Sequence, residues 1–279
     1  MPAALVVVAL GVTAAAFVPL LADRGKPAQP GRKELGTLSR EALGKVLFWS
    51  TGFLGWFQGQ PRSWPAHPDR NVPVLLVADT HHGRHAMFAL AWFLRRRGHG
   101  TVWAVGTGRG GLSDRAATVE GYAARLLADT GSSQIDIVAH GIGGLVAGWY
   151  VSHLGGKAHV RHQVTMGTPW HGTRMAAFSR APLASETLPN APLLDGLRPP
   201  QVPLTCIWGS MDPMVLPRES AFVDGATSVR LSGAGHLDLL LSARAFRAVD
   251  AALTGAGPTD PEHKPDVDGK AEPSTEVAG

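Results

Sequence analysis

Two patterns of apolar and polar positions alternate between residues 72 and 256. Short continuous apolar runs are typical of strands buried on both faces of a parallel sheet, and longer runs at helical spacing lie between them. The short runs predict strands at residues 72–79, 101–105, 135–139, 162–167, 203–209 and 228–232. The longer runs predict helices at residues 85–98, 115–131, 143–156 and 242–253. This alternation predicts an α/β domain with a mostly parallel sheet, covered by helices on both faces.

The N-terminal part of the chain carries a different pattern. Residues 3–22 are apolar and uncharged, about the length that crosses a bilayer as a helix. A cleavable signal peptide is the alternative, but only the α-amino group is positive before the run. Basic residues follow it, which favours a cytoplasmic main domain by the positive-inside rule. We therefore expect residues 1–24 to form a membrane-anchor helix.

Two further segments flank the main domain, one on its N-terminal side and one on its C-terminal side. Residues 25–71 hold charges in their first half and aromatic residues in their second, followed by a proline-rich linker. This pattern is typical of an interfacial amphipathic helix, or equally of a helix packed on the main domain. Residues 257–279 are rich in proline and charge without apolar periodicity, which predicts disorder. The α/β domain is therefore expected to occupy residues 72–256.

Composition excludes some functions. The net charge of +4 and a pI near 9.6 would suit a nucleic-acid-binding protein. However, many basic residues lie before residue 50, and residues 95–97 end a predicted helix, where cations are favourable. No basic stripe interleaved with aromatic residues is present, so we expect no nucleic-acid partner. The single cysteine, Cys206, lies in a predicted buried strand and is expected to be a core residue.

The segment DIVAHGIGGLVAGWY, residues 136–150, predicts a strand, a tight glycine turn and a helix. This is the form of a nucleophile elbow, in which a strained turn presents a reactive side chain. The residue at the turn is Gly141, which has no side chain. Ligand sites in parallel sheets lie at the carboxyl ends of the strands. Asp212 and His236 follow the fifth and sixth predicted strands, and so are expected at the same edge as the elbow.

Four motifs occur in a characteristic order: VAHGIGGLVA, MGTPWHGT, IWGSMDPMVLPRESA and LSGAGHLDLLLS. Together they resemble successive signatures of bacterial α/β-hydrolases of the triacylglycerol-lipase and esterase type, over about residues 72–253. The resemblance implies an α/β-hydrolase fold, a short cap over residues 174–200 and an acyl-transfer site without a cofactor. It also implies that the expected membrane is the bacterial inner membrane.

The same resemblance assigns roles at the site. Asp212 corresponds to the acid and His236 to the base of a catalytic triad. The backbone N–H groups of Ile142 and Thr80 correspond to the oxyanion hole. Gly141 stands at the position of the nucleophilic serine, which is therefore vacant. Triad knockouts lower turnover by roughly six orders of magnitude.

A second departure from the pattern follows the first predicted strand. Asp79 stands where the resemblance leads us to expect glycine. Its carboxylate would oppose a developing oxyanion if it points inward, and would be harmless if it caps the following helix. Two departures at one site favour a pseudoenzyme that binds a lipid or a hydrophobic ester at a membrane.

Two other functions stay open at this stage. One is an active carboxylic-ester hydrolase that uses an unconventional nucleophile or a water activated by the Asp212–His236 pair. Ser210, Thr80 and Thr168 lie in nearby loops, but none of them stands on the elbow. The other is a non-catalytic scaffold that binds a protein partner. We expect no metal site, because the histidine group His81, His82 and His85 lacks a carboxylate or cysteine at zinc-like spacing.

Overall fold

A computed structural model describes residues 66–80, 83–179, 183–197 and 200–256. Its centre is a six-stranded sheet with the strand order β2-β1-β3-β4-β5-β6, in which all neighbouring strands are parallel. The strands are β1 (Val74–Val77), β2 (Val102–Val105), β3 (Ile135–His140), β4 (Val160–Met166), β5 (Leu204–Gly209) and β6 (Thr227–Leu231). The predicted mostly parallel sheet is confirmed.

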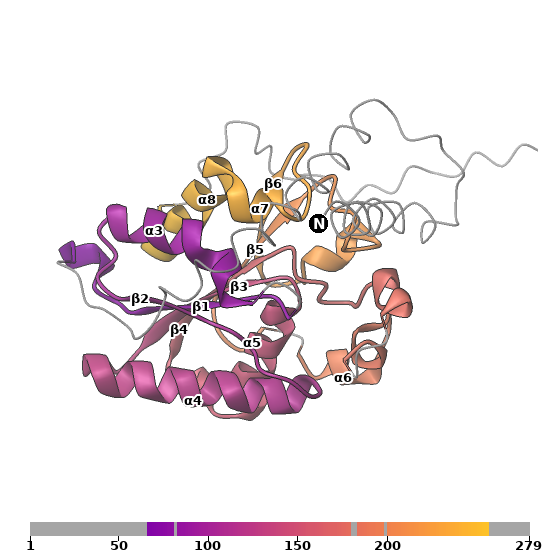
Figure 1. Cartoon of the computed structure of the whole chain (residues 1–279), viewed down its shortest axis with the longest axis horizontal. Helices are drawn as coiled ribbons and strands as arrows, with labels where there is room; N and C mark the ends of the chain where they lie inside the picture. The colour runs from indigo at the N-terminus through magenta and orange to yellow at the C-terminus, as the bar shows by residue number, and fades with distance from the viewer. Residues whose placement is uncertain (1–65, 81–82, 180–182, 198–199, 257–279) are drawn as a thin grey trace, which may run out of the picture.

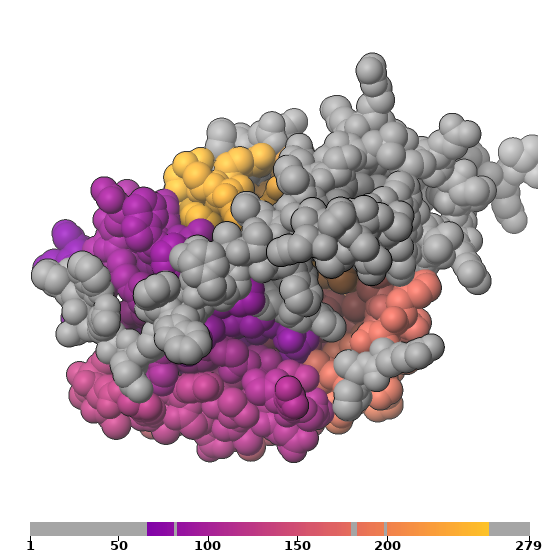
Figure 2. Space-filling view, in the orientation of Figure 1, coloured from indigo at the N-terminus to yellow at the C-terminus, as the bar shows by residue number. Residues whose placement is uncertain are grey.

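Helices cover both faces of this sheet. They are α3 (Phe88–Arg96), α4 (Leu112–Thr130), α5 (Ile142–His153), α6 (Pro192–Asp195), α7 (Asp238–Leu241) and α8 (Ala243–Thr254). Short 3₁₀ turns are η2 (Pro68–Arg70), η3 (Arg84–Met87), η4 (Gly156–Ala158), η5 (Arg174–Phe178), η6 (Ser185–Thr187) and η7 (Arg218–Ala221). Helices α3 and α8 lie on one side of the sheet and α4 and α5 on the other (Figure 1). The space-filling view likewise shows α8 and α4 at opposite sides of the molecule (Figure 2).

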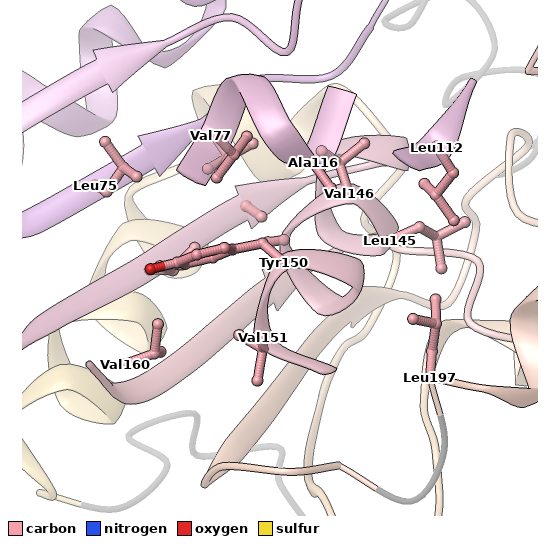
Figure 3. Packing of buried hydrophobic residues seen from close by; sticks show 14 of the residues in the cluster. Leu75, Val77, Leu112, Ala116, Leu145, Val146, Tyr150, Val151, Val160 and Leu197 are labelled. Carbon is pink, nitrogen blue, oxygen red and sulfur yellow. The ribbon is translucent and has the colours of Figure 1, made fainter. Parts of the chain in front are cut away.

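The buried strands divide their side chains between two cores. Leu75 and Val77 pack in the cluster with α4 and α5, whereas Val74 and Leu76 pack with α3 and α8. This alternation follows from the two-residue period of a strand. Figure 3 shows Leu75 and Val77 among the buried residues of α4 and α5. Continuous apolar runs are therefore needed because both faces of each strand are buried.

Helix α5 lies close against the sheet because glycines occupy its second and third positions. A Cβ atom on Gly143 would lie 2.7 Å from the carbonyl oxygen of Ala78 and 2.9 Å from that of Val77. Any side chain at residue 143 would therefore push α5 away from the end of β1. This close approach brings the elbow near the residues that leave β1.

Several predicted boundaries differ from the structure. The helix expected over residues 85–98 is a 3₁₀ turn followed by α3, and the first strand ends at Val77, before Asp79. Within residues 174–200, the described parts form η5, η6 and α6. Most of residues 25–71 and all of 257–279 lie outside the described residues. The predictions for those segments are therefore untested.

The structure contradicts the predicted membrane anchor and the membrane location inferred from it. In the part of the chain that the structure describes, no helix is both long and apolar enough to cross a bilayer. Residues 1–24, on which this prediction rested, lie outside the described part.

Candidate active site

The glycine turn between β3 and α5 has the backbone of an elbow. Gly141 has φ 55° and ψ −131°, a conformation that strains any residue with a Cβ atom. Its N–H donates to the carbonyl of Met166 at 2.9 Å, and its own carbonyl accepts from the Thr168 hydroxyl at 2.9 Å. The turn is thus held in the strained backbone geometry of an elbow, at a residue without a side chain.

The Asp79 carboxylate points into this turn. Its Oδ2 atom accepts a hydrogen bond from the Ile142 N–H at 3.0 Å. A Cβ atom built on Gly141 would lie 2.0 Å from the same oxygen. Asp79 therefore takes the space where a side chain at residue 141 would begin, and accepts from the backbone N–H that the resemblance assigns to the oxyanion hole.

Two features stabilise a buried carboxylate at this position. The side chain lies at the N-terminus of α5, where the helix dipole favours negative charge. The buried guanidinium of Arg115 also interacts with it: burial lowers the pKa of Arg115, and the Asp79 charge opposes that lowering. Asp79 thus caps α5, and does not cap the helix that follows it in sequence.

His236 and Asp212 form a buried hydrogen-bonded pair. The Nδ1 atom of His236 lies 2.7 Å from Oδ2 of Asp212, and the two residues are 5% and 1% exposed. The other carboxylate oxygen of Asp212 accepts from the N–H groups of Met214 and Val215 at 2.7 and 3.1 Å. Because the carboxylate accepts at Nδ1, the neutral ring of His236 carries its lone pair on Nε2.

His140, the last residue of β3, belongs to the same site. Its ring is fully buried, and its centroid lies 4.4 Å from that of His236. Its Nε2 donates to the His236 carbonyl at 3.3 Å. Sequence reasoning passed over this residue; the available signal was an imidazole at the carboxyl end of a buried strand.

Asp79, His140 and His236 together form a cluster of buried donor atoms. One side-chain N or O atom from each lies within 4.8 Å of the others. The histidines that the sequence suggested are elsewhere: His81 and His82 lie outside the described residues, and His85 is in η3. Burial lowers the pKa of His85.

Two of the hydroxyl groups considered as replacement nucleophiles make hydrogen bonds elsewhere, and the single thiol is buried. The Thr168 hydroxyl donates to the Gly141 carbonyl, and the Ser210 hydroxyl accepts from the Gly233 N–H at 2.9 Å. Burial raises the pKa of the Cys206 thiol to about 11, so it is not a thiolate at neutral pH. Thr80 follows Asp79 directly and is half-buried.

No protein-family model matches the chain. Among solved structures, lipase B of Aspergillus fumigatus is similar with a TM-score of 0.61 at 18% identity, covering 74% of this chain and 58% of that one. The mature lipase BlEst2 of Bacillus licheniformis gives 0.59 at 15% identity, covering 70% and 97%. The esterase RhEst1 of a Rhodococcus species gives 0.50 at 16%, covering 71% and 94%.

These likenesses establish the class of fold. The chain has the α/β-hydrolase fold, and its structural neighbours are lipases and esterases. The fold predicted from the motif order is therefore confirmed. The chain covers only 58% of the Aspergillus lipase, so it corresponds to a part of that enzyme.

Proposed function

We propose that this lipase/esterase-like α/β-hydrolase does not hydrolyse carboxylic esters by a serine mechanism, and instead binds a neutral lipid or hydrophobic ester. The observation that supports this is the position of the Asp79 carboxylate. It lies against the Ile142 N–H and in the space that a side chain at residue 141 would need. Residue 141 carries no nucleophilic side chain, and the Asp79 carboxylate takes the space that one would need.

Electrostatics oppose acyl transfer at this site. An oxyanion donor such as the Ile142 N–H is worth about 2.7–4 kcal/mol in transition-state stabilisation. Two negative charges about 4 Å apart repel by about 4 kcal/mol at an effective dielectric constant of about 20. The Asp79 carboxylate would therefore cancel the benefit of the donor that it occupies.

The same charge favours a neutral ligand. A free fatty acid would place its carboxylate beside that of Asp79, whereas an uncharged ester avoids this repulsion. In its neutral form, the His236 ring held by Asp212 presents Nε2 as an acceptor for a hydroxyl of such a ligand. The ester class is inferred from the fold, because its neighbours are lipases and esterases.

The test compares ester turnover with ester binding in the full chain. Turnover of p-nitrophenyl esters should equal the background and stay unchanged in His236→Ala. Thermal unfolding with a non-hydrolysable ether analogue of a long-chain ester should show a higher Tm, and the matched fatty acid a smaller rise. Turnover by the parent that His236→Ala abolishes would contradict the proposal and favour a hydrolase with an activated water. An equal Tm with and without the analogue would contradict the proposed ligand binding and favour a non-catalytic scaffold.

A further inference from the structure

We propose that Asp79, His140 and His236 form a binding site for a divalent transition-metal ion of the zinc class. The three residues come from distant parts of the chain, at the end of β1, the end of β3 and the loop after β6. All are buried, at 5%, 0% and 5% exposure, and one donor atom from each lies within 4.8 Å of the others.

The donor set suits such an ion. Two imidazoles and one carboxylate are ligands that zinc and similar divalent ions accept, with positions left open for water or another ligand. Ligands at about 2.1 Å from one tetrahedral ion lie about 3.4 Å apart. Because no pair in the cluster is more than 4.8 Å apart, binding would require each pair to close by at most roughly 1.4 Å.

Hydrogen bonds already orient the three ligands. In the neutral rings, the bond from His236 Nδ1 to Asp212 leaves Nε2 as the ligating atom. The bond from His140 Nε2 to the His236 carbonyl leaves Nδ1 as the ligating atom of that ring. Outer carboxylate or carbonyl partners of this kind fix the orientation of metal-binding histidines.

Gly141 contributes to the proposed metal site because it leaves room for the third ligand, Asp79. Oδ2 of Asp79 would collide with a Cβ atom at residue 141, so only glycine lets this carboxylate lie beside the histidines. Oδ2 accepts from Ile142, and a carboxylate has about four lone-pair sites on its two oxygens. The site therefore depends on the two departures at residues 79 and 141 together.

The experiment is titration of the full, metal-free chain with Zn²⁺ alone, followed by calorimetry and by thermal unfolding. We expect one ion bound per chain and a higher Tm. Asp79→Asn, which keeps the shape and the acceptor for Ile142, should weaken Zn²⁺ binding by at least about 100-fold, and so should His140→Gln. Asp212→Asn should weaken binding by about 10–100-fold, as expected for an outer partner.

Matched controls separate this site from adventitious binding. Asp224→Asn, at an exposed position, and His162→Gln, in which the histidine lies on β4 and contacts Thr205, should bind as the parent does. Circular dichroism verifies that each variant folds. An absence of Zn²⁺ binding in the parent, or binding that survives in both Asp79→Asn and His140→Gln, would overturn the proposal. Neither readout uses ester turnover. A bound ion would occupy Nε2 of His236 and offset the Asp79 charge, so the ligand-binding test of the proposed function applies to the metal-free chain.

Discussion

The carboxylate of Asp79 occupies the space in which the side chain of residue 141 would begin. Its Oδ2 lies 2.0 Å from the Cβ position of Gly141 and 3.0 Å from the Ile142 N–H. The two residues are 62 positions apart in sequence, yet the Asp79 side chain can lie here only because residue 141 is glycine. A glycine at 141 removes the collision, and the N-terminus of α5 then holds the carboxylate.

This relationship predicts that the two residues are energetically coupled. Gly141→Ala should destabilise the fold by about 1–3 kcal/mol from backbone strain alone, and by more because its methyl group meets Asp79. In an Asp79→Gly background the collision disappears, so the cost should fall towards the strain value. Urea unfolding of the parent, both single variants and the double variant measures the coupling. Strictly additive changes would show that the two groups do not meet.

A second prediction concerns the close approach of α5 to the sheet. Gly143→Ala should destabilise the protein by at least about 1–3 kcal/mol, because its methyl group would meet two backbone carbonyls of β1 and its exit. Gly121→Ala is the matched control. Gly121 is exposed within α4 and has no atom within 4 Å of a Cβ position, so alanine there should stabilise by about 0.5–1 kcal/mol. Denaturant midpoints of the two variants should therefore move in opposite directions.

A third prediction concerns pH and the buried carboxylate of Asp250 on α8. Burial raises its pKa, but hydrogen bonds from His99 and Arg97 and the nearby charge of Arg70 outweigh this and leave the pKa lowered. A lowered pKa in the folded state means that this stabilisation is present above the unfolded-state pKa of about 3.9 and is lost as pH falls through the folded value.

Asp250→Asn should therefore destabilise the protein at pH 7 by about 1–3 kcal/mol, as expected for hydrogen bonds to a charged group. The difference between parent and variant should shrink below about pH 4, because the unfolded chain takes up the proton first and the folded carboxylate becomes neutral only at lower pH. Thermal unfolding across this range, with Asp224→Asn as an exposed control, tests the prediction. A difference independent of pH would mean that the charge contributes nothing.

The parts of the fold that sequence reasoning predicted are those with local signals. Buried strands, the helices between them and the elbow at Gly141 follow from periodicity and turn residues. The proximity of Asp212 and His236 followed from motif order, because both were expected at the carboxyl edge of one sheet. Helix boundaries were less accurate, since the 3₁₀ turn before α3 leaves no distinct apolar period.

The direction of the Asp79 side chain could not be predicted in the same way. The carboxylate could point into the site or cap the following helix. Which of these occurs depends on a contact between the end of β1 and the start of α5. Such a contact depends on three-dimensional packing and leaves no periodic signal. His140 was overlooked for a related reason, since a histidine in a buried strand is also consistent with an ordinary core residue.

Restored ester hydrolysis would test most directly the claim that Asp79 blocks an otherwise competent site. The account predicts p-nitrophenyl ester turnover at background for the parent, and little gain for Gly141→Ser, because the serine meets the Asp79 carboxylate. The double variant Gly141→Ser/Asp79→Gly should turn over the ester well above background and lose this activity on His236→Ala. Gly141→Ser alone matching the folded double variant, or the parent itself showing His236-dependent turnover, would contradict the account.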